Sequence, residues 1–418
     1  MTGPLDGIRI LDLTTVAFGP YASQILGDQG AEVIKIEPPQ GDSTRYTGPS
    51  RHPGMSAMFL ALNRNKKSVV LDLKLATDRE RLWGLATEAD VVMHNVRLQK
   101  AKRIGIDHEA IRARNPRIVY AHLSGFGETG PYAGRPAYDD IIQAMSGGVS
   151  LMQRQSGEPR YLPTILADKT SGVVAAQAIT AALLARSRHG RGVHVEVPMY
   201  ETMVAFTLLE HWYGRFFEEH AAQSGYPRAL DPSRRPYATR DGYVCVMPYN
   251  DRHWKEFWTS AGRTDLADDP RFQTISGRTS NISELYGLLE ATLAQGTTEE
   301  WLTLCSRFEI PACKVFDVVD IVDDEHLNAV GFFREMDHPS EGRLRMMTSP
   351  VLFDGQRAQL SPAPRLGQHN PEYISAGFEQ SCRHEVECRL GSAAYHQEPE
   401  HQAMAKTVTE GRLPDGRK

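Results

Sequence analysis

The sequence predicts an α/β protein that combines a large domain, built on a Rossmann-like parallel sheet, with a smaller α/β domain. Two apolar segments rich in β-branched residues, 8–13 and 31–37, enclose a loop and a helical stretch. This order of strand, loop, helix and strand is typical of a parallel sheet with a right-handed crossover. A linker rich in Gly, Pro and Arg at residues 224–235 precedes further strand-like and helical segments, which indicates a second domain.

Size and charge exclude several classes of protein. The chain has 418 residues, enough for two domains, and a net charge of -5 with both signs dispersed. The absence of a block of Lys and Arg argues against nucleic acid or a membrane as a partner. No signal peptide is expected, and the most apolar stretch, residues 173–185, is too short to span a bilayer.

Cysteine usage indicates free thiols. The five cysteines are an odd count in a chain of this length and argue against a disulfide framework. Cys382, His384 and Cys388 match no common zinc pattern, so we expect no metal site. Free thiols fit a reducing compartment, and the protein is therefore expected in the cytoplasm.

The start of the chain predicts a ligand site. A loop over residues 14–20 follows the first strand, and a helix over residues 21–27 precedes the second strand, which Pro38 terminates. In open parallel sheets, ligands bind outside the carboxyl ends of the strands. Residues 14–18 and 38–45 are therefore expected to border a binding site.

A basic turn opens the next strand, over residues 62–74. Taken alone, this turn is interpreted as solvated surface. A helix at residues 78–89 and a strand at residues 90–95 continue the alternation of the first domain.

A glycine motif follows the next strand: Gly125, Gly127 and Gly130 match the dinucleotide pattern G-x-G-x-x-G. A dinucleotide loop runs directly into a helix whose N-terminus meets the pyrophosphate. Here Pro131 follows, and no helical pattern begins before about Asp139. We therefore reject the interpretation as an NAD-dependent redox enzyme.

Asp168 stands just before a predicted helix rich in Ala and Leu that ends in basic residues and glycines near Gly190. A carboxylate in this position accepts N–H bonds from the first helical turn, so one interpretation is a helix cap. The small residues Thr170, Ser171 and Gly172 favour another, because they allow a ligand or a second backbone to come close. The residues alone leave both interpretations open.

The rest of the chain predicts more helices and a small second domain. A helix over residues 200–219 carries an apolar stripe, which indicates core or dimer contact. The second domain is expected to contain strands at residues 237–248 and 310–316 and helices at residues 252–261, 282–294 and 298–308.

Several of these segments together resemble the class III CoA-transferase family, which includes the formyl-CoA and carnitine CoA-transferases. The resemblance covers roughly residues 5–378. It is carried by residues 62–74, 95–97, 124–139, 166–172, 190–197 and 362–369.

The resemblance implies a fold and an assembly. It implies a large CoA-binding domain over residues 1–222, completed by residues 324–390, and a smaller α/β domain over residues 223–323. Residues 391–418 are expected to form a polar tail beyond the family region. Members of the family form interlocked, ring-like homodimers, so self-association is expected.

The resemblance also implies a site. Asp168 matches the family's nucleophile. Arg45 is expected to replace the family arginine at Pro38, and Arg64 is a further candidate cation for the CoA phosphates. The positions expected to bind CoA are Val16, Ala17, Leu71, Lys74, Asn95, Val96, Arg97, Arg103, Tyr138 and Asp139.

The implied reaction moves CoA from an acyl-CoA to a free carboxylic acid. It passes through an aspartyl anhydride and an aspartyl-CoA thioester, with no permanently bound cofactor and no metal. An acyl-CoA racemase of the same fold is the alternative. Related racemases use a His near position 138, where this sequence has Tyr138, and this favours transfer. A non-catalytic acyl-CoA binder is less favoured. The sequence identifies neither the donor nor the acceptor acid, nor the donors of an oxyanion hole.

Overall fold

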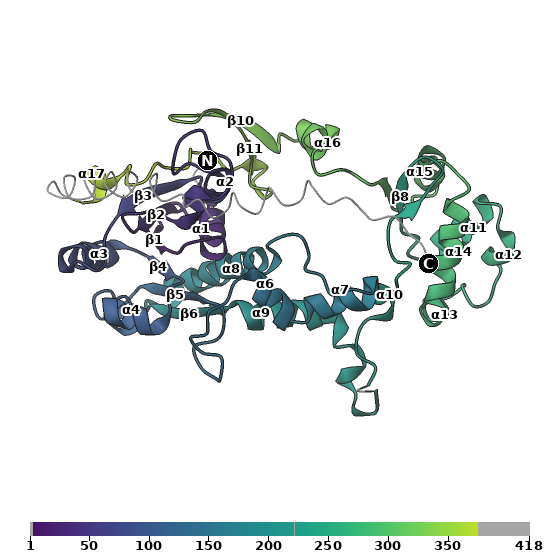
Figure 1. Cartoon of the computed structure of the whole chain (residues 1–418), viewed down its shortest axis with the longest axis horizontal. Coiled ribbons are helices and arrows are strands. Elements are labelled where there is room, and N and C mark those ends of the chain that lie inside the picture. Colours follow the sequence, from purple (N-terminus) through teal and green to yellow (C-terminus); the bar gives the residue numbers. More distant parts are fainter. Residues whose placement is uncertain (1–2, 221, 375–418) are drawn as a thin grey trace, which may run out of the picture.

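A computed structural model describes residues 3–220 and 222–374 of the chain (Figure 1). Its main element is a six-stranded sheet with the order β3-β2-β1-β4-β5-β6, in which every neighbouring pair is parallel. The strands are β1 (Arg9–Leu13), β2 (Glu32–Glu37), β3 (Lys66–Val70), β4 (Val91–His94), β5 (Val119–Ser124) and β6 (Val193–Pro198). The predicted parallel sheet is confirmed. The strand order reverses between β1 and β4, and ligands bind at such a point in open α/β sheets.

Helices cover both faces of this sheet. One face buries a cluster with Ile10 and Val119 against α1 (Phe18–Asp28) and α8 (Leu166–His189). The other buries Leu11 and Tyr120 against α3 (Ala76–Glu88), α4 (Leu98–Ile104) and α5 (His108–Arg112). Ile10 and Leu11 are both fully buried on opposite faces, as expected for a strand covered on both sides.

Helix α1 begins at Phe18, three residues before the predicted start. The sequence interpretation took Pro20 as part of the loop, and this was wrong. Pro20 lies in the first turn of the helix. A backbone N–H in this turn has no acceptor within the helix, so the missing N–H of proline breaks no helical hydrogen bond. The earlier start brings the helix N-terminus directly behind Val16.

Further helices connect or flank the sheet. The helix predicted over residues 200–219 ends at His211, and short 3-10 turns follow it. These elements are η1 (Ser43–Tyr46), α2 (Ala57–Leu62), α6 (Asp139–Met145), α7 (Gly148–Ser156), α9 (Met199–His211), η2 (Tyr213–Phe216) and η3 (Glu218–His220).

A second, smaller body has its own sheet and core. Its antiparallel sheet has the order β7-β8-β9, with β7 (Tyr237–Ala238), β8 (Tyr243–Val246) and β9 (Ala312–Lys314). The helices of this body and its approach are α10 (Pro227–Leu230), α11 (Asp251–Ser260), α12 (Thr264–Ala267), α13 (Ile275–Ser280), α14 (Ile282–Leu293) and α15 (Thr298–Arg307). The three predicted helices of the small domain are confirmed as α11, α14 and α15.

The chain then crosses back to the large sheet, as the green to yellow ribbon of Figure 1 shows. Backbone bonds from Asn65 to Ser361 and from His369 to Ser68 tie the returning segment to the edge next to β3. Its elements are η4 (Ile321–Asp323), α16 (Glu325–Ala329), β10 (Phe333–His338), β11 (Gly342–Met347), β12 (Leu352–Phe353), β13 (Gln356–Arg357) and α17 (Asn370–Tyr373).

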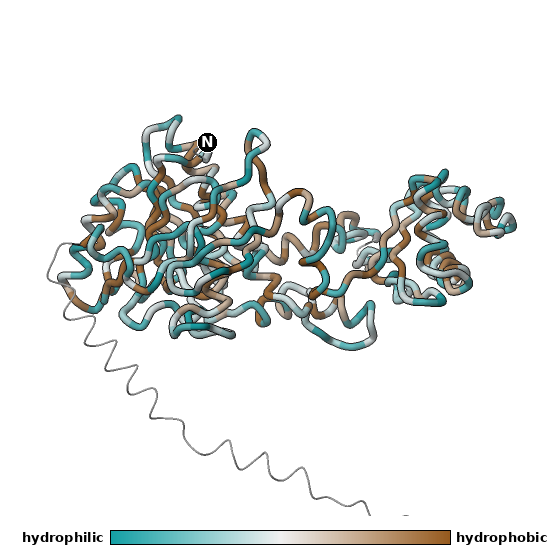
Figure 2. The backbone as a smooth tube through the Cα atoms, turned by 90° about the horizontal axis from the view of Figure 1, so that it is seen from above, coloured by the Kyte–Doolittle hydropathy of each residue, from teal (hydrophilic) through white to brown (hydrophobic). Residues whose placement is uncertain are grey.

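Seen from above, the two bodies are joined by a narrower stretch of chain, and each has hydrophobic segments of its own (Figure 2). This matches the two separate core clusters of the six-stranded sheet and the third cluster around β8. The exact division into residues 1–222, 223–323 and 324–390 stays a prediction. The polar tail at residues 391–418 and the Cys382–Cys388 segment lie outside the described residues.

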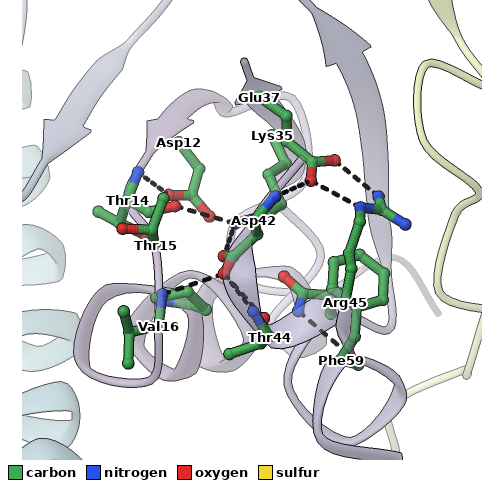
Figure 3. A network of polar contacts seen from close by, with 12 residues as sticks. Asp12, Thr14, Thr15, Val16, Lys35, Glu37, Asp42, Thr44, Arg45 and Phe59 are labelled. Atoms are coloured by element: carbon green, nitrogen blue, oxygen red, sulfur yellow. Dashed lines mark hydrogen bonds and ion pairs between the residues drawn. The ribbon is translucent and has the colours of Figure 1, made fainter. Parts of the chain in front are cut away.

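Buried ion pairs lie behind the loop that follows β1 (Figure 3). Lys35 Nζ is 2.9 Å from Asp42 Oδ2, and both side chains are fully buried. Asp42 Oδ1 accepts the backbone N–H of Val16 at 3.2 Å. Val16 has a φ of 71°, which is a strained conformation for a β-branched residue. The ion pair therefore helps to hold a strained loop in place.

Two arginines expected to bind CoA are engaged elsewhere. Arg45 is 1% exposed and forms a two-point ion pair with Glu37, at 2.7 and 2.8 Å. Arg64 is 5% exposed and its Nε donates to Asp28 at 3.1 Å. Buried guanidinium groups need partners of this kind. The expectation that Arg45 and Arg64 are free to meet phosphates was therefore wrong.

Replacing Lys35 by Met is expected to destabilise the protein by about 3 kcal/mol, because Asp42 would remain as a buried charge without its cation. Urea unfolding measures the change. The control is Arg160→Met, which removes an exposed ion pair with Glu158 and should cost about 0–1 kcal/mol. Equal losses in the two variants would contradict a structural role for the buried pair.

Candidate active site

A cleft of about 240 Å³ opens at the carboxyl ends of β1, β4 and β5. This is the edge of the sheet at which the sequence predicted a ligand. Its lining comes from the loops after the three strands, from the segment before α6 and from the start of α8. The lining residues are Thr15, Val16, Phe18, Asn95, Arg97, Leu98, His122, Leu123, Ser124, Gly125, Phe126, Gly127, Glu128, Gly134, Arg135, Pro136, Ala137, Tyr138, Asp168 and Met199.

Asp168 lies inside the first turn of α8, not before it. The helix begins at Leu166 with Ile165 as its N-cap, so the predicted boundary was three residues late. The carboxylate of Asp168 has no hydrogen bond or ion pair with any residue that the structure describes, so it does not cap the helix. Of the two interpretations left open by the sequence, the helix cap is therefore wrong, and the carboxylate lines the cleft instead.

Close packing fixes the start of α8. A Cβ on Gly172 would lie 2.9 Å from the ring of Tyr21 and 3.0 Å from the carbonyl oxygen of Phe18. The small residues after Asp168 therefore let α1 and α8 approach closely, as one sequence interpretation expected. This contact holds α8 against the start of α1, which directly follows the loop at Val16.

Asp139 positions the backbone of Asp168. Its Oδ1 accepts a hydrogen bond from the backbone N–H of Asp168 at 3.0 Å. Its Oδ2 accepts one from Nε2 of Gln143 at 2.6 Å. Gln143 also receives the N–H of Leu162 and donates to the carbonyl of Thr164. This small network fastens the loop before α8 to helix α6.

Burial raises the pKa of Asp168 to about 7, and the negative charge of nearby Asp139 adds to the increase. The N-terminus of α8 acts in the opposite direction, but a helix end at a partly exposed site contributes only about 0.3–1 kcal/mol. A pKa near neutrality is typical of carboxylates that react, because the ionised form is present without being strongly stabilised by partners.

Four of the predicted CoA-binding residues line the cleft: Val16, Asn95, Arg97 and Tyr138. The side chain of Asn95 bridges the first two loops, since it accepts from the N–H of Thr15 at 3.2 Å and donates to its carbonyl at 2.9 Å. Arg97 is exposed and has no ion pair among the described residues. It is therefore available to an anionic ligand.

The other predicted contacts lie around the cleft or behind it. Ala17 and Leu71 are each 1% exposed, and Asp139 is 6% exposed beneath Asp168. Val96 packs against the second core cluster. Lys74 and Arg103 are exposed cations outside the lining, on the segment after β3 and on α4.

Sequence reasoning missed a histidine in the cleft. His122 lies on β5, and its Nδ1 is 2.7 Å from Oε1 of Glu128, which also lines the cleft. A carboxylate on Nδ1 places the ring proton there and leaves Nε2 as the reactive atom. No residue in the described ranges bonds to this Nε2.

His94 supports His122 from the neighbouring strand. The two rings are stacked with centroids 4.8 Å apart. Val96 donates its N–H to Nδ1 of His94, so the proton of His94 is on Nε2 and is donated to Tyr120. Burial, helped by His122, holds the pKa of His94 well below its usual range. His94 is thus a neutral, fixed platform for His122.

Comparison with known proteins agrees with this fold. Residues 5–370 match the family model described as CoA-transferase family III. The chain is 34% identical to a "Probable fatty acyl-CoA transferase Rv3272" of Mycobacterium tuberculosis, over 89% of this chain and 98% of that protein. It is 32% identical to the succinyl-CoA:glutarate CoA-transferase of Mus musculus, over 88% and 84% of the two chains.

Solved structures show the same fold. A crystal structure of Rv3272 superposes with a TM-score of 0.77 at 33% identity, covering 89% of this chain and 99% of that one. A CAIB/BAIF family protein from Brucella suis gives a TM-score of 0.73 at 30% identity, covering 92% and 100%.

The fold and the matches define a CoA-transferase. The chain belongs to CoA-transferase family III. Within the described ranges, no helix is long and apolar enough to cross a membrane. The same residues hold no group of three or more His, Cys, Asp or Glu side chains arranged to bind a metal ion.

Replacing Asp168 by Asn is expected to stabilise the protein near pH 8, by on the order of 2 kcal/mol after allowance for partial solvent access. The folded-state pKa of about 7 lies above the usual value, so the folded protein binds this proton more tightly than the unfolded chain. The contribution of Asp168 to the free energy of unfolding of the wild-type protein therefore falls as the pH rises from about 4 to 7. Thermal unfolding should show a larger gain near pH 8 than near pH 5.

The control for this effect is Asp140→Asn, which changes an exposed carboxylate on the same α6 turn as Asp139. It should leave stability almost unchanged at both pH values. A gain for Asp168→Asn that does not depend on pH would contradict the raised pKa.

Proposed function

We propose that the protein transfers CoA from an acyl-CoA donor to a free carboxylic acid through covalent intermediates on Asp168. The observation that supports this most directly is the carboxylate of Asp168 itself. It lines the cleft at the strand ends, lacks a partner among the described residues and has a pKa of about 7. Family membership supports the overall transfer, and this side chain supports the covalent route.

The proposed reaction has two reversible halves. A carboxylate oxygen of Asp168 attacks the thioester carbon, the carbon–sulfur bond breaks, and CoA leaves as a thiolate with the bonding pair. The thiolate then attacks the aspartyl carbonyl of the mixed anhydride, which releases the donor acid and leaves CoA bound to Asp168 as a thioester. The acceptor carboxylate repeats both steps in reverse order. No net proton or electron is consumed.

The surroundings of Asp168 suit this chemistry. Partial burial limits the water that would hydrolyse an anhydride. In the first turn of α8, the N–H groups of Leu166, Asp168 and Lys169 are already donated to Thr164, Asp139 and Ile165. Gly147 is the N-cap of α7 and does not line the cleft. Gly127, which does line it, already donates its N–H to Glu201.

Three exposed cations at the cleft and on neighbouring segments suit the nucleotide end of CoA. Arg97 lies at the cleft, and Lys74 and Arg103 are exposed on neighbouring segments. CoA carries several phosphate charges, so it needs a few cations within reach of its nucleotide but none at the thioester. We propose that these three residues hold the phosphates while Asn95 and Val16 contact the pantetheine.

We also propose that the protein works as the interlocked homodimer expected from the resemblance. Large apolar side chains on α9 and η2 are exposed in the single chain, including Phe206, Leu209 and Phe216. Patches of this kind usually mark an interface. The cytoplasmic location expected from the sequence stays a prediction.

Small carboxylic acids and their CoA esters are the proposed substrates. Relatives are named for succinyl-CoA and glutarate, and for acetyl-CoA and oxalate. A panel of these donors and acids, extended by longer acyl chains, is therefore the reasonable set for an activity test.

Incubation with a reactive acyl-CoA is expected to add CoA to the protein as a thioester on Asp168. Intact-mass analysis followed by peptide mapping measures the adduct. Asp168→Asn should form none and should lose transfer activity by roughly a thousandfold or more. Asp140→Asn, two residues from Tyr138 on the same turn of chain, should still form the adduct. Unchanged turnover in Asp168→Asn would exclude the covalent route.

The second candidate is an acyl-CoA racemase or epimerase, and the position of His122 favours it. Exchange of an α-proton between two faces of a substrate requires two bases. The sequence lacks the expected His at position 138, yet the fold brings His122 into the same cleft as Asp168. Glu128 fixes the tautomer of His122 that leaves Nε2 free to accept a proton.

Deuterium incorporation separates the two candidates. A 2-methylacyl-CoA is incubated in deuterium oxide without any acceptor acid, and its α-carbon is examined by NMR. A racemase would incorporate deuterium in the wild-type protein and lose this exchange by roughly a hundredfold or more in His122→Gln. Absence of α-deuterium in a wild-type preparation that transfers CoA would exclude the second candidate.

A further inference from the structure

Two cysteines lie side by side on the small sheet, far from the cleft in the fold. Cys245 on β8 and Cys313 on β9 are directly opposite each other in the antiparallel register. The bond from the N–H of Met247 to the carbonyl of Pro311, 2.9 Å long, fixes this register next to them. Both cysteines are free thiols.

The pair faces away from the core of the small body. Val244 and Val246, the neighbours of Cys245 on β8, are buried in the third core cluster. Side chains alternate along a strand, so Cys245 points to the opposite face of the sheet, and Cys313 shares that face. Cys313 is exposed and Cys245 is half-buried. Cys305, in contrast, is fully buried in the core.

The backbone geometry permits a bond between the two sulfurs. Met247 and Pro311 form a hydrogen-bonded pair, and such pairs recur at every second position. Cys245 and Cys313 therefore occupy a hydrogen-bonded pair, in which the Cα atoms are about 5.5 Å apart. Disulfides span Cα separations of about 4.4–6.8 Å. A bridge needs no movement of the strands past each other.

The same geometry makes the bridge reducible. Cβ atoms directly opposite in a sheet are about 4.5–5.5 Å apart, whereas disulfides hold them about 3.5–4.5 Å apart. Closing the bond thus requires the side chains to be pulled together. Strained and accessible disulfides have the higher reduction potentials and behave as reversible bonds.

An apolar pocket gives access to the thiols. Its volume is about 560 Å³, and both cysteines line it together with Arg234, Arg235 and Met247. Arg235 is paired with Glu290, but Arg234 has no ion pair among the residues described. Arg234, which lines the pocket, gives this face a positive charge that attracts an anionic oxidant.

We propose that Cys245 and Cys313 form a reversible disulfide, with a low-molecular-weight anionic disulfide such as glutathione disulfide as the oxidant. The thiolate of exposed Cys313 attacks one sulfur of the oxidant, forms a mixed disulfide and releases one glutathione thiolate. The thiolate of Cys245 attacks the Cys313 sulfur and releases the second. The protein loses two protons and two electrons, and the oxidant becomes two thiols.

The order of attack follows from accessibility. Burial, followed by the neighbouring Cys313 thiol, raises the pKa of Cys245. Cys245 is therefore less suited than Cys313 to attack the oxidant. Because it lies directly opposite Cys313, it is well placed to attack the mixed disulfide formed there.

Thiol mapping of the full-length protein tests the proposal. The protein carries Cys382→Ser and Cys388→Ser so that only the three remaining cysteines report. It is incubated with glutathione disulfide, alkylated, digested and analysed by mass spectrometry. Cys245 and Cys313 should lose alkylation together, the intact mass should fall by two hydrogen atoms, and dithiothreitol should restore both thiols.

Single substitutions provide matched controls. In Cys245→Ser the mixed disulfide cannot resolve, so Cys313 should accumulate a stable glutathione adduct. In Cys313→Ser the modification should be at least roughly tenfold slower, because Cys245 is the less accessible thiol. A wild-type Cys313 that keeps glutathione as a stable adduct, or an unchanged pair of free thiols, would overturn the proposal.

Discussion

The fully buried ion pair between Lys35 and Asp42 is the constraint on which the geometry of the cleft depends. It lies between β2 and the loop after β1, where a positive φ at Val16 would otherwise relax. Lys35 also donates to the carbonyl of Thr14 at 2.9 Å. One cation thus fixes two points of the loop that lines the site. Buried pairs of this kind contribute little net stability, so their role here is to specify a single loop conformation.

The carboxylate of Asp168, where we propose that the reaction takes place, has surroundings opposite to those of Asp42. Asp42 is saturated with donors, and a cation, a hydroxyl and two backbone N–H groups compensate its charge. Asp168 receives none of these and has the negative Asp139 beneath it. Asp42 is therefore held in its ionised form, whereas Asp168 remains available to form a bond. The same residue type performs both tasks because the neighbours differ.

Much of the fold was readable from the sequence, and the reasons are local. Apolar strands, alternation with helices and the Pro131 stop after the glycine motif each depend on residues close together in the chain. The partners of buried charges could not be predicted from the sequence. Arg45 was interpreted as a ligand for phosphate, but its partner Glu37 lies on β2, and it also donates to the carbonyls of Gly54 and Pro364. The pairing of His94 with His122 likewise depends on the register of β4 and β5, which only the assembled sheet defines.

The exposure of the cleft limits what one chain can do alone. An aspartyl anhydride persists only where water is kept out, yet Tyr138 at the rim is 70% exposed and Arg97 is exposed as well. A pantetheine chain bound as proposed would cover the side toward Val16 and Asn95 and would leave the side of Tyr138 open. The remaining cover has to come from a closing segment or from a second copy of the chain. The apolar side chains exposed on α9 favour the second copy, because large apolar patches are usually covered by a partner even where no catalytic site is involved. Catalysis and assembly would then depend on the same contact.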